Sequence, residues 1–245
     1  MVLTLRALAE VLGPDEDGVD PELGRPFIRY RSINEADSDS CMDWRADIVM
    51  WTSEGDEVLA GFVDFLTLKA DSLPEGDSML YLLDSISEEA ASFSRFFEGG
   101  WVGPEIEDTV SAGHVEYIVI LTYVFVESPL RGMQLGVWAI SEVAHRMLPA
   151  HTGLLLMATS TSTVAPGETE VSKFQRKREA RLGQYWCSAG LSQIDGHPGF
   201  LAGSPAFKTL GEAREALRGI GDVRRTLTTA ELLSGEIDAS TLDIE

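Results

Sequence analysis

One stretch of the chain, residues 119–136, constrains the fold more than any other. It begins with a continuous apolar run rich in β-branched and aromatic residues, which is typical of a buried strand. The run ends before Pro129, and a helical pattern of apolar residues follows to about residue 148. Gly132 and Gly136 lie in the connecting turn, where small residues let the backbone come close to a ligand. Because the first amides of a helix have no partner inside it, the pattern predicts an anion site.

The residue spacing around this turn limits which anionic ligands the turn could bind. The chain has no Gly-Lys-Ser/Thr and no G-x-G-x-x-G, so neither the Lys-containing phosphate loop nor the dinucleotide fingerprint is present. The turn resembles instead the acyl-CoA pyrophosphate loop of the GNAT superfamily of N-acetyltransferases, in which a strand ending in Val leads to R/Q-x-x-G-x-G/A. Here Val126 precedes a motif that runs from Arg131 to Gly136, with Gln134 in place of the usual fourth-position glycine. A turn that uses its glycines only for packing is the plainer alternative.

A second motif supports the same resemblance. Residues 178–191 resemble the late helix of the family, which packs beside the cofactor and leads into the last two strands. The matching positions are Leu182, Tyr185, Trp186 and Gly190, and Leu191 replaces a phenylalanine. The resemblance covers about residues 45–203, and two motifs in the correct order are harder to obtain by accident than one.

The resemblance implies a cofactor site and a reaction. Acetyl-CoA would be the acyl donor, and a primary amine would attack it directly in a ternary complex, without a metal ion. The strand would bind the pantetheine arm and the turn amides the pyrophosphate. The residues expected to bind the cofactor are Val124, Phe125, Val126, Arg131, Gly132, Met133, Gln134, Leu135 and Gly136.

Proton transfer needs a base for the incoming ammonium and an acid for the departing thiolate. Glu116, at the start of the central strand, is the first candidate base, and Glu127, at its end, is the second; the alternative for both is a solvated strand end. The family commonly places its acidic Tyr four residues before the late-helix glycine, a position that Trp186 occupies here. The neighbouring Tyr185 is therefore the candidate acid, although it points about 100° away around the helix.

The charge of the chain limits its partners. With 19 Lys and Arg against 40 Asp and Glu, the net charge is −21, which argues against a general nucleic-acid binder. The acidic excess suits a cationic acceptor, such as a small-molecule amine or a Lys-rich peptide, or serves only solubility. No stretch approaches the ~20 apolar residues that span a bilayer, so no membrane partner is expected and the default is a cytoplasmic protein. The oligomeric state stays open, with a homodimer among the options.

The expected fold class is α/β (α+β): a single GNAT-like mixed, mostly antiparallel twisted sheet flanked by helices. An N-terminal helix and acidic linker (1–24) precede the acyl-CoA-binding domain (25–204), and a C-terminal helix and acidic tail follow (205–245). The expected strands are 27–33, 44–52, 58–68, 115–126 and 154–159 with a final hairpin inside 190–203, and the expected helices are 3–12, 171–189, 209–217 and 229–233.

Residues 71–113 form an expected helical insertion. Ser85 to Glu88 fit a capping box. One face of the helix, packed on the sheet, would contain Ile86, Ala90, Phe93 and Phe97. On the helix after the motif turn, the expected outward face includes Ser141.

A second function class stays open. In the family two helices lie between the first and second strands, yet only residues 34–43 are available here. With Gln134 and Trp186, this shortage supports a catalytically inactive binding or assembly module that uses the insertion and the acidic tail as contact surfaces.

Overall fold

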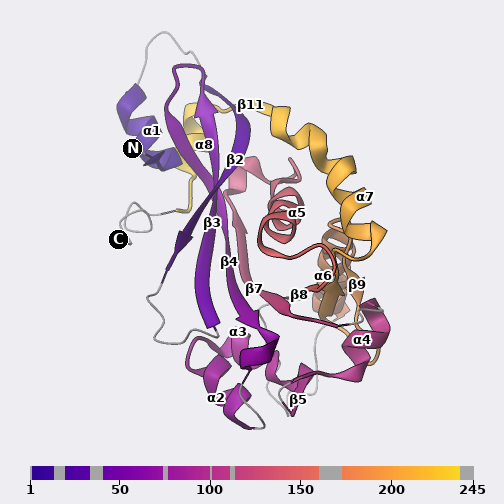
Figure 1. Cartoon of the computed structure of the whole chain (residues 1–245). Helices are drawn as coiled ribbons and strands as arrows, with labels where there is room; N and C mark the ends of the chain where they lie inside the picture. Colours follow the sequence, from indigo (N-terminus) through magenta and orange to yellow (C-terminus); the bar gives the residue numbers. More distant parts are fainter. Residues whose placement is uncertain are drawn as a thin grey trace.

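A central sheet organises the structure, a computed structural model that describes residues 2–13, 20–33, 41–73, 77–99, 101–110, 114–159 and 173–237. Its strands are β1 (Val2–Leu3), β2 (Glu22–Ser32), β3 (Cys41–Thr52), β4 (Glu57–Lys69), β7 (Tyr117–Val126), β8 (Gly153–Ala158), β9 (Ser192–Gln193), β10 (Phe200–Gly203) and β11 (Arg224–Thr226). They lie in the order β11-β2-β3-β4-β7-β8-β10-β9, and β1 pairs with one end of β4 (Figure 1).

The sheet is mixed and mostly antiparallel. On the main path β7 and β8 run parallel and the other neighbouring pairs are antiparallel. Helices flank it, namely α1 (Leu5–Leu12), α5 (Leu135–Met147), α6 (Lys173–Cys187), α7 (Lys208–Leu217) and α8 (Thr229–Leu233). The expected class, a mixed α/β fold with a mostly antiparallel open sheet between helices, is confirmed.

Both faces of the central strand are buried. Val119 and Leu121 belong to the core under α5, whereas Ile118 and Ile120 belong to a second core under the insertion. Because neighbouring residues of a strand point to opposite faces, this double burial requires an apolar residue at every position. It explains the continuous apolar run of the sequence.

The insertion differs from the single helix that its sequence predicts. It contains α2 (Asp77–Asp84), the one-turn α3 (Glu88–Ala91), a 3-10 turn (Ser94–Phe96), a hairpin of β5 (Phe97–Glu98) and β6 (Trp101–Val102), and α4 (Pro104–Val110). Ser87, rather than Ser85, caps α3, because its hydroxyl accepts a hydrogen bond from the Ala90 N–H. The chain then leaves the helix so that Phe93 and Phe96 both meet the edge of the Phe200 ring. Phe93 is fully buried on the sheet side, as expected, and so is Phe96, which the helical pattern had not placed there, whereas Phe97 begins β5 and is only partly buried.

Two further expectations need correction. Ser141 is buried, not outward, because α5 lies between the sheet and α7 and has neighbours on most of its surface. The linker expected to reach residue 24 ends earlier, since Glu22–Gly24 already belongs to β2 and pairs with β11. The short strands β1 and β11 carry no recognisable pattern of their own. The expected loop 160–169 and most of the short connection 34–43 lie outside the described residues.

Candidate functional site

The central strand runs on beyond its parallel neighbour. β7 pairs with β8 from Tyr117 to Leu121, and its remaining residues, 122–126, pair with β4 alone among the described strands. Asp64 of β4 faces Tyr123 while Phe65 faces Leu121, so Thr122 is an extra residue in β7. Such a bulge bends a strand and increases its twist. The result is a strand edge at residues 122–126 that no described strand pairs on the side of β8, directly before the motif turn.

The motif turn presents several backbone amides. A 3-10 turn (Ser128–Leu130) follows β7, and α5 then begins at Leu135. In the described part of the chain, the N–H groups of residues 132–136 have no hydrogen-bond acceptor, and Trp138 is the first residue to donate back to Gln134. Gly132 and Gln134 both have positive φ, 89° and 61°. Gln134 therefore adopts the left-handed conformation that the glycine of the family motif would favour.

Gly136 has a packing role in addition. A Cβ at this position would lie 3.3 Å from the Trp186 ring and 3.4 Å from the Tyr185 hydroxyl. The absent side chain lets α6 pack tightly against the first turn of α5. The packing explanation therefore holds for this glycine.

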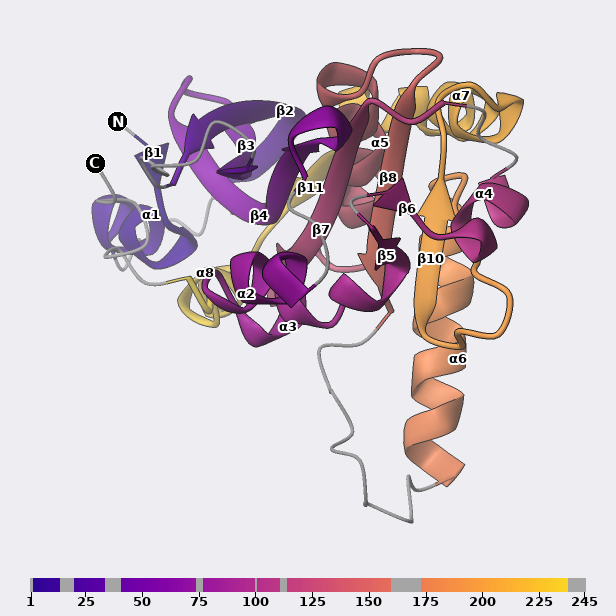
Figure 2. The ribbon, with the colours of Figure 1, turned by 60° about the horizontal axis from the view of Figure 1, so that its bottom comes forward.

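Tyr185 and Trp186 of α6 lie in different environments. Trp186 is buried in the core, and Tyr185, at 37% exposure, lies against its ring with centroids 4.7 Å apart. Burial raises the pKa of the Tyr185 hydroxyl above its ordinary value, and the nearby Val137 N–H opposes that rise. The hydroxyl thus lies at the start of α5, beside the free amides. Figure 2 shows α6, which carries both residues, extending past the edge of the sheet.

The side chains of the strand edge point to both faces. Val124 and Val126 pack against the core that contains α5, whereas Phe125 stacks on Phe62 of β4 with ring centroids 5.6 Å apart. Met133 is half-buried against the same core, and Leu135 is fully within it. These apolar side chains fix the strand and the turn in place.

The Arg131 side chain contacts groups outside residues 132–136. Its Nε donates to the Val126 carbonyl at 2.9 Å, and its Nη2 lies 3.1 Å from Glu236 Oε1. Glu127, expected as a second candidate base, is fully buried and accepts hydrogen bonds from the backbone N–H groups of Glu236 and Ile237. Both residues hold the segment that follows α8.

Glu116 lies at the wrong end of the strand for the motif turn. It precedes β7, which is 10 residues long and thus separates Glu116 from the turn by about 30 Å. Its carboxylate accepts from the Thr152 hydroxyl and lies 3.8 Å from His114 Nε2, with half of the side chain exposed. The structure therefore does not bring Glu116 together with Tyr185 or the turn.

The sequence reasoning missed a row of polar side chains beside the bulge. Arg45, Asp64 and Tyr123 are consecutive partners across β3, β4 and β7, on the face opposite α5. The Arg45 guanidinium makes two hydrogen bonds to Asp64, at 2.6 and 2.8 Å, and lies over the Phe62 ring. The available signal was the period-two alternation of Asp43, Arg45 and Asp47 along one strand.

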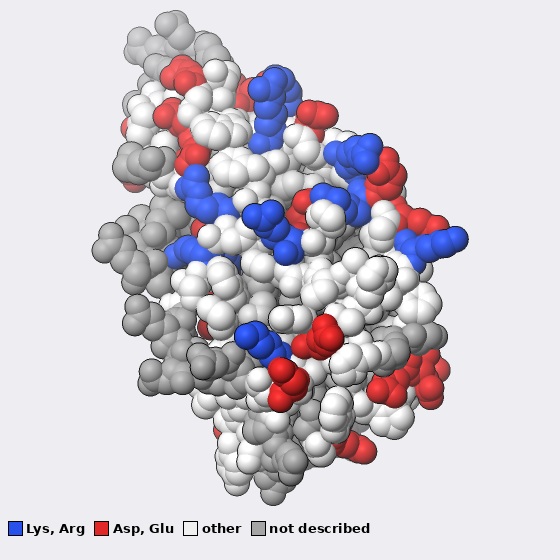
Figure 3. All heavy atoms as spheres, in the orientation of Figure 1, with Lys and Arg blue, Asp and Glu red and all other residues white. Residues whose placement is uncertain are grey.

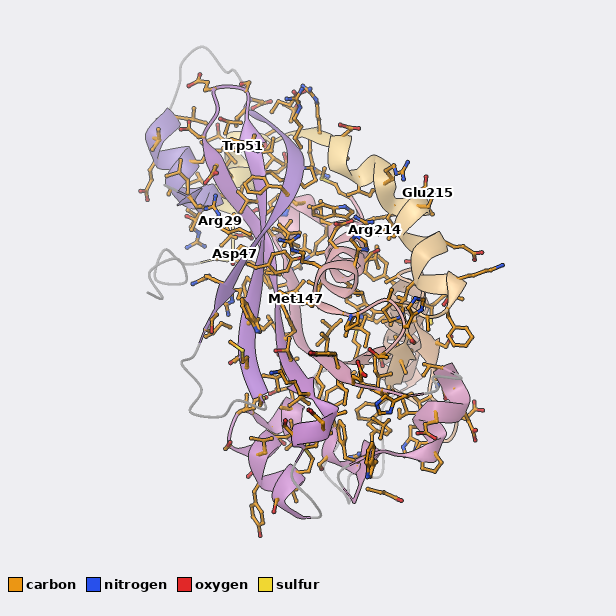
Figure 4. All side chains as sticks on the ribbon, in the orientation of Figure 1. Arg29, Asp47, Trp51, Met147, Arg214 and Glu215 are labelled. Carbon is orange, nitrogen blue, oxygen red and sulfur yellow. The ribbon has the colours of Figure 1, made fainter. Side chains whose placement is uncertain are left out.

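The same row extends to the neighbouring strand. Arg31 Nε donates to Asp47 Oδ2 at 3.1 Å, and burial raises the pKa of the Asp47 carboxyl while Arg31 opposes the rise. Asp47 Oδ1 and Arg45 Nη1 are buried and have no hydrogen-bond partner among the residues that the structure describes. Figure 4 shows Asp47 and Arg29 on the adjacent strands of this part of the sheet. Such a network orders the strands but is costly to desolvate.

Charges on the molecule are interspersed. In Figure 3, Lys and Arg side chains alternate with Asp and Glu over the described part of the visible face. Arg214 of α7, for example, lies between the helices and pairs with Glu142 of α5 at 3.0 Å (Figure 4). The described residues contain no cluster of three or more His, Cys, Asp or Glu that could hold a metal ion. Nor does any described helix have the length and apolar character needed to cross a membrane.

Comparison with known proteins adds no relative. No protein-family model, no curated protein and no solved structure matches this chain. Its function has to be argued from the site itself.

Proposed function

We propose that this chain is an acyl-CoA-dependent N-acyltransferase that moves an acetyl or short acyl group from acetyl-CoA to a primary amine. The observation that carries the proposal is the extension of β7 beyond its pairing with β8, immediately before a turn whose amides have no acceptor among the described residues. The order of elements agrees with the resemblance: a fourth long strand, the motif turn and helix, a further strand, the late helix α6 and a final hairpin.

In the proposed complex the turn holds the anionic end of the cofactor. The N–H groups of residues 132–136 and the positive end of α5 would bind the pyrophosphate. Backbone groups at Val124 and Val126 would pair with the pantetheine amides, as an added strand does. The thioester would then reach the bulge at Thr122, where a backbone N–H can stabilise the oxyanion as the amine attacks.

Proton transfer in this proposal does not use Glu116. Tyr123 follows the bulge and is 43% exposed, so its hydroxyl is the candidate to relay a proton between the attacking amine and solvent. Tyr185 lies next to the turn, so it would be closer to the pyrophosphate of the cofactor than to the thioester. A cationic acceptor remains a proposal that rests on the net charge of −21.

The addition of a charge without a change of shape tests the cofactor site. Gln134→Glu adds one negative charge at the exposed turn and should weaken acetyl-CoA binding at least about fivefold in calorimetry. Gln193→Glu, on the exposed strand β9, adds the same charge elsewhere and should leave the affinity unchanged. Absence of binding to the wild-type chain at millimolar acetyl-CoA would refute the proposal.

The alternative is a catalytically inactive module with the same cofactor site. It is favoured by the burial of Trp186 at the position of the family's acid and by the exposed Tyr81 and Trp101 of the insertion, which suit a contact surface. The two proposals separate in one assay, thiol release from acetyl-CoA with a panel of amines. Binding without thiol release identifies the module, whereas release that Tyr123→Phe slows identifies the enzyme.

A further inference from the structure

The segment after α8 is tied to both sides of the motif turn. Before the turn, the buried Glu127 carboxylate accepts from the Glu236 N–H at 2.8 Å and from the Ile237 N–H at 2.9 Å. Within the turn, Arg131 Nη2 lies 3.1 and 3.3 Å from the two carboxylate oxygens of Glu236. Gly235 also packs closely, since a Cβ there would lie 2.9 Å from Leu5 of α1.

These contacts differ in strength. The Glu127 hydrogen bonds are buried and charge-assisted, so they hold the segment firmly. The Arg131–Glu236 pair has side chains 53% and 45% exposed, so water screens it and its net contribution is small. The backbone of the segment is thus held firmly, whereas the Glu236 carboxylate can leave Arg131 and be replaced by another anion.

The Glu236 carboxylate takes the place at the Arg131 guanidinium that a phosphate group would take. Two carboxylate oxygens contact one guanidinium nitrogen, and guanidinium groups recognise carboxylate and phosphate with the same donors. Arg131 immediately precedes the free amides of residues 132–136. The Glu236 charge therefore lies near the place where an anionic ligand would bind and disfavours its approach.

We propose that Glu236 is an autoinhibitory anion that competes with the cofactor phosphates for Arg131. This inference rests on the proposed function, because it takes the motif turn as the pyrophosphate site. On binding, Arg131 exchanges Glu236 for a phosphate oxygen, while Glu127 keeps residues 236 and 237 in place. The C-terminal segment thereby sets how tightly the turn binds anions.

Neutralising Glu236 tests the competition. Glu236→Gln should tighten acetyl-CoA binding up to about fivefold at low salt, and the gain should shrink at high salt. Glu215→Gln is the control: this variant removes the same charge from α7, together with an ion pair to Arg218 that is even more exposed than the Arg131–Glu236 pair (Figure 4). The control should leave the affinity unchanged. Unchanged or weaker binding by Glu236→Gln would overturn the inference.

The role of Arg131 is tested in a double-mutant cycle. In an Arg131→Gln background the Glu236→Gln gain should disappear, and a gain that persists would show that Glu236 acts through general charge instead. If acetyl-CoA binds none of the variants, the proposed function fails, and inorganic pyrophosphate becomes the probe. Tighter pyrophosphate binding by Glu236→Gln would then support the competition alone, and no pyrophosphate binding by any variant would reject it.

Discussion

Replacement of Gln134 by glycine tests the backbone conformation on which the candidate site depends. Gln134 has φ 61° and ψ 16°, and its side chain makes no capping hydrogen bond. A residue with a Cβ pays about 1–2 kcal/mol in this left-handed region, whereas glycine pays none. Glycine loses about 0.5–1 kcal/mol more through the freedom of the unfolded chain. The net expectation is a stabilisation of about 0.5–1 kcal/mol.

Urea unfolding followed by tryptophan fluorescence measures this difference. For a chain of this size the gain corresponds to a rise in Tm of about 1–4 °C. Gln134→Ala keeps the Cβ and therefore the strain, so it should stay within about 0.5 kcal/mol of the wild type. Glu212→Gly, at an exposed position of α7, should instead lose about 0.5–1 kcal/mol.

The comparison of the three variants decides the argument. If Gln134→Gly is no more stable than Gln134→Ala, or loses as much as Glu212→Gly, the left-handed conformation at this position is wrong. The turn amides would then point elsewhere, and the argument for an anion site at the start of α5 would lose its basis. If the expected order is found, Gln134→Gly should also bind acetyl-CoA at least as tightly as the wild type.

Four further predictions concern packing, anchoring and pH. Gly136→Ala should destabilise by about 1–3 kcal/mol in urea, because the new methyl group meets the Trp186 ring at 3.3 Å. Phe96→Ala should cost about 3–5 kcal/mol in the same assay, since its fully buried ring fills the core under the insertion. Glu127→Gln should cost about 1–3 kcal/mol and speed proteolysis after α8, because an amide offers one acceptor oxygen for two backbone donors. The hydrogen bond from the Thr228 N–H lowers the pKa of the Glu231 carboxyl. The stability that the ionised carboxylate contributes is therefore present above pH ~4.3 and is lost as the pH falls through the lowered pKa. In urea titrations Glu231→Gln should flatten this loss on the acid side.

The sequence predicted the elements whose signal is local. The long strands were found because each carries its own run of apolar or alternating residues, and the late helix because of its spacing and the stop at Gly190, which has φ 89°. The short strand β11 was missed because its partner, β2, lies near the other end of the chain. Pairing over such a separation leaves no trace in a window of the sequence.

The candidate site was predictable in part for the same reason. The turn and the strand before it are contiguous, so a motif in the sequence can point to the amides that have no acceptor among the described residues. Arg45, Asp64 and Tyr123 become neighbours only through the register of three strands, which the sequence does not specify. The partners of Glu127 and Arg131 lie 105 to 110 residues away, so their anchoring of the C-terminal segment could not be read from either residue alone.

The pairing of β2 with β11 also affects how the chain matures. Arg224 and Glu22, which are 202 residues apart, form an ion pair across these two strands. During ribosomal synthesis the outer edge of β2 at residues 22–24 has no β11 until residues 224–226 have emerged. An uncovered edge strand is a template for association with other chains, so a nascent chain stalled before residue 224 should be a better chaperone client than a chain that includes β11.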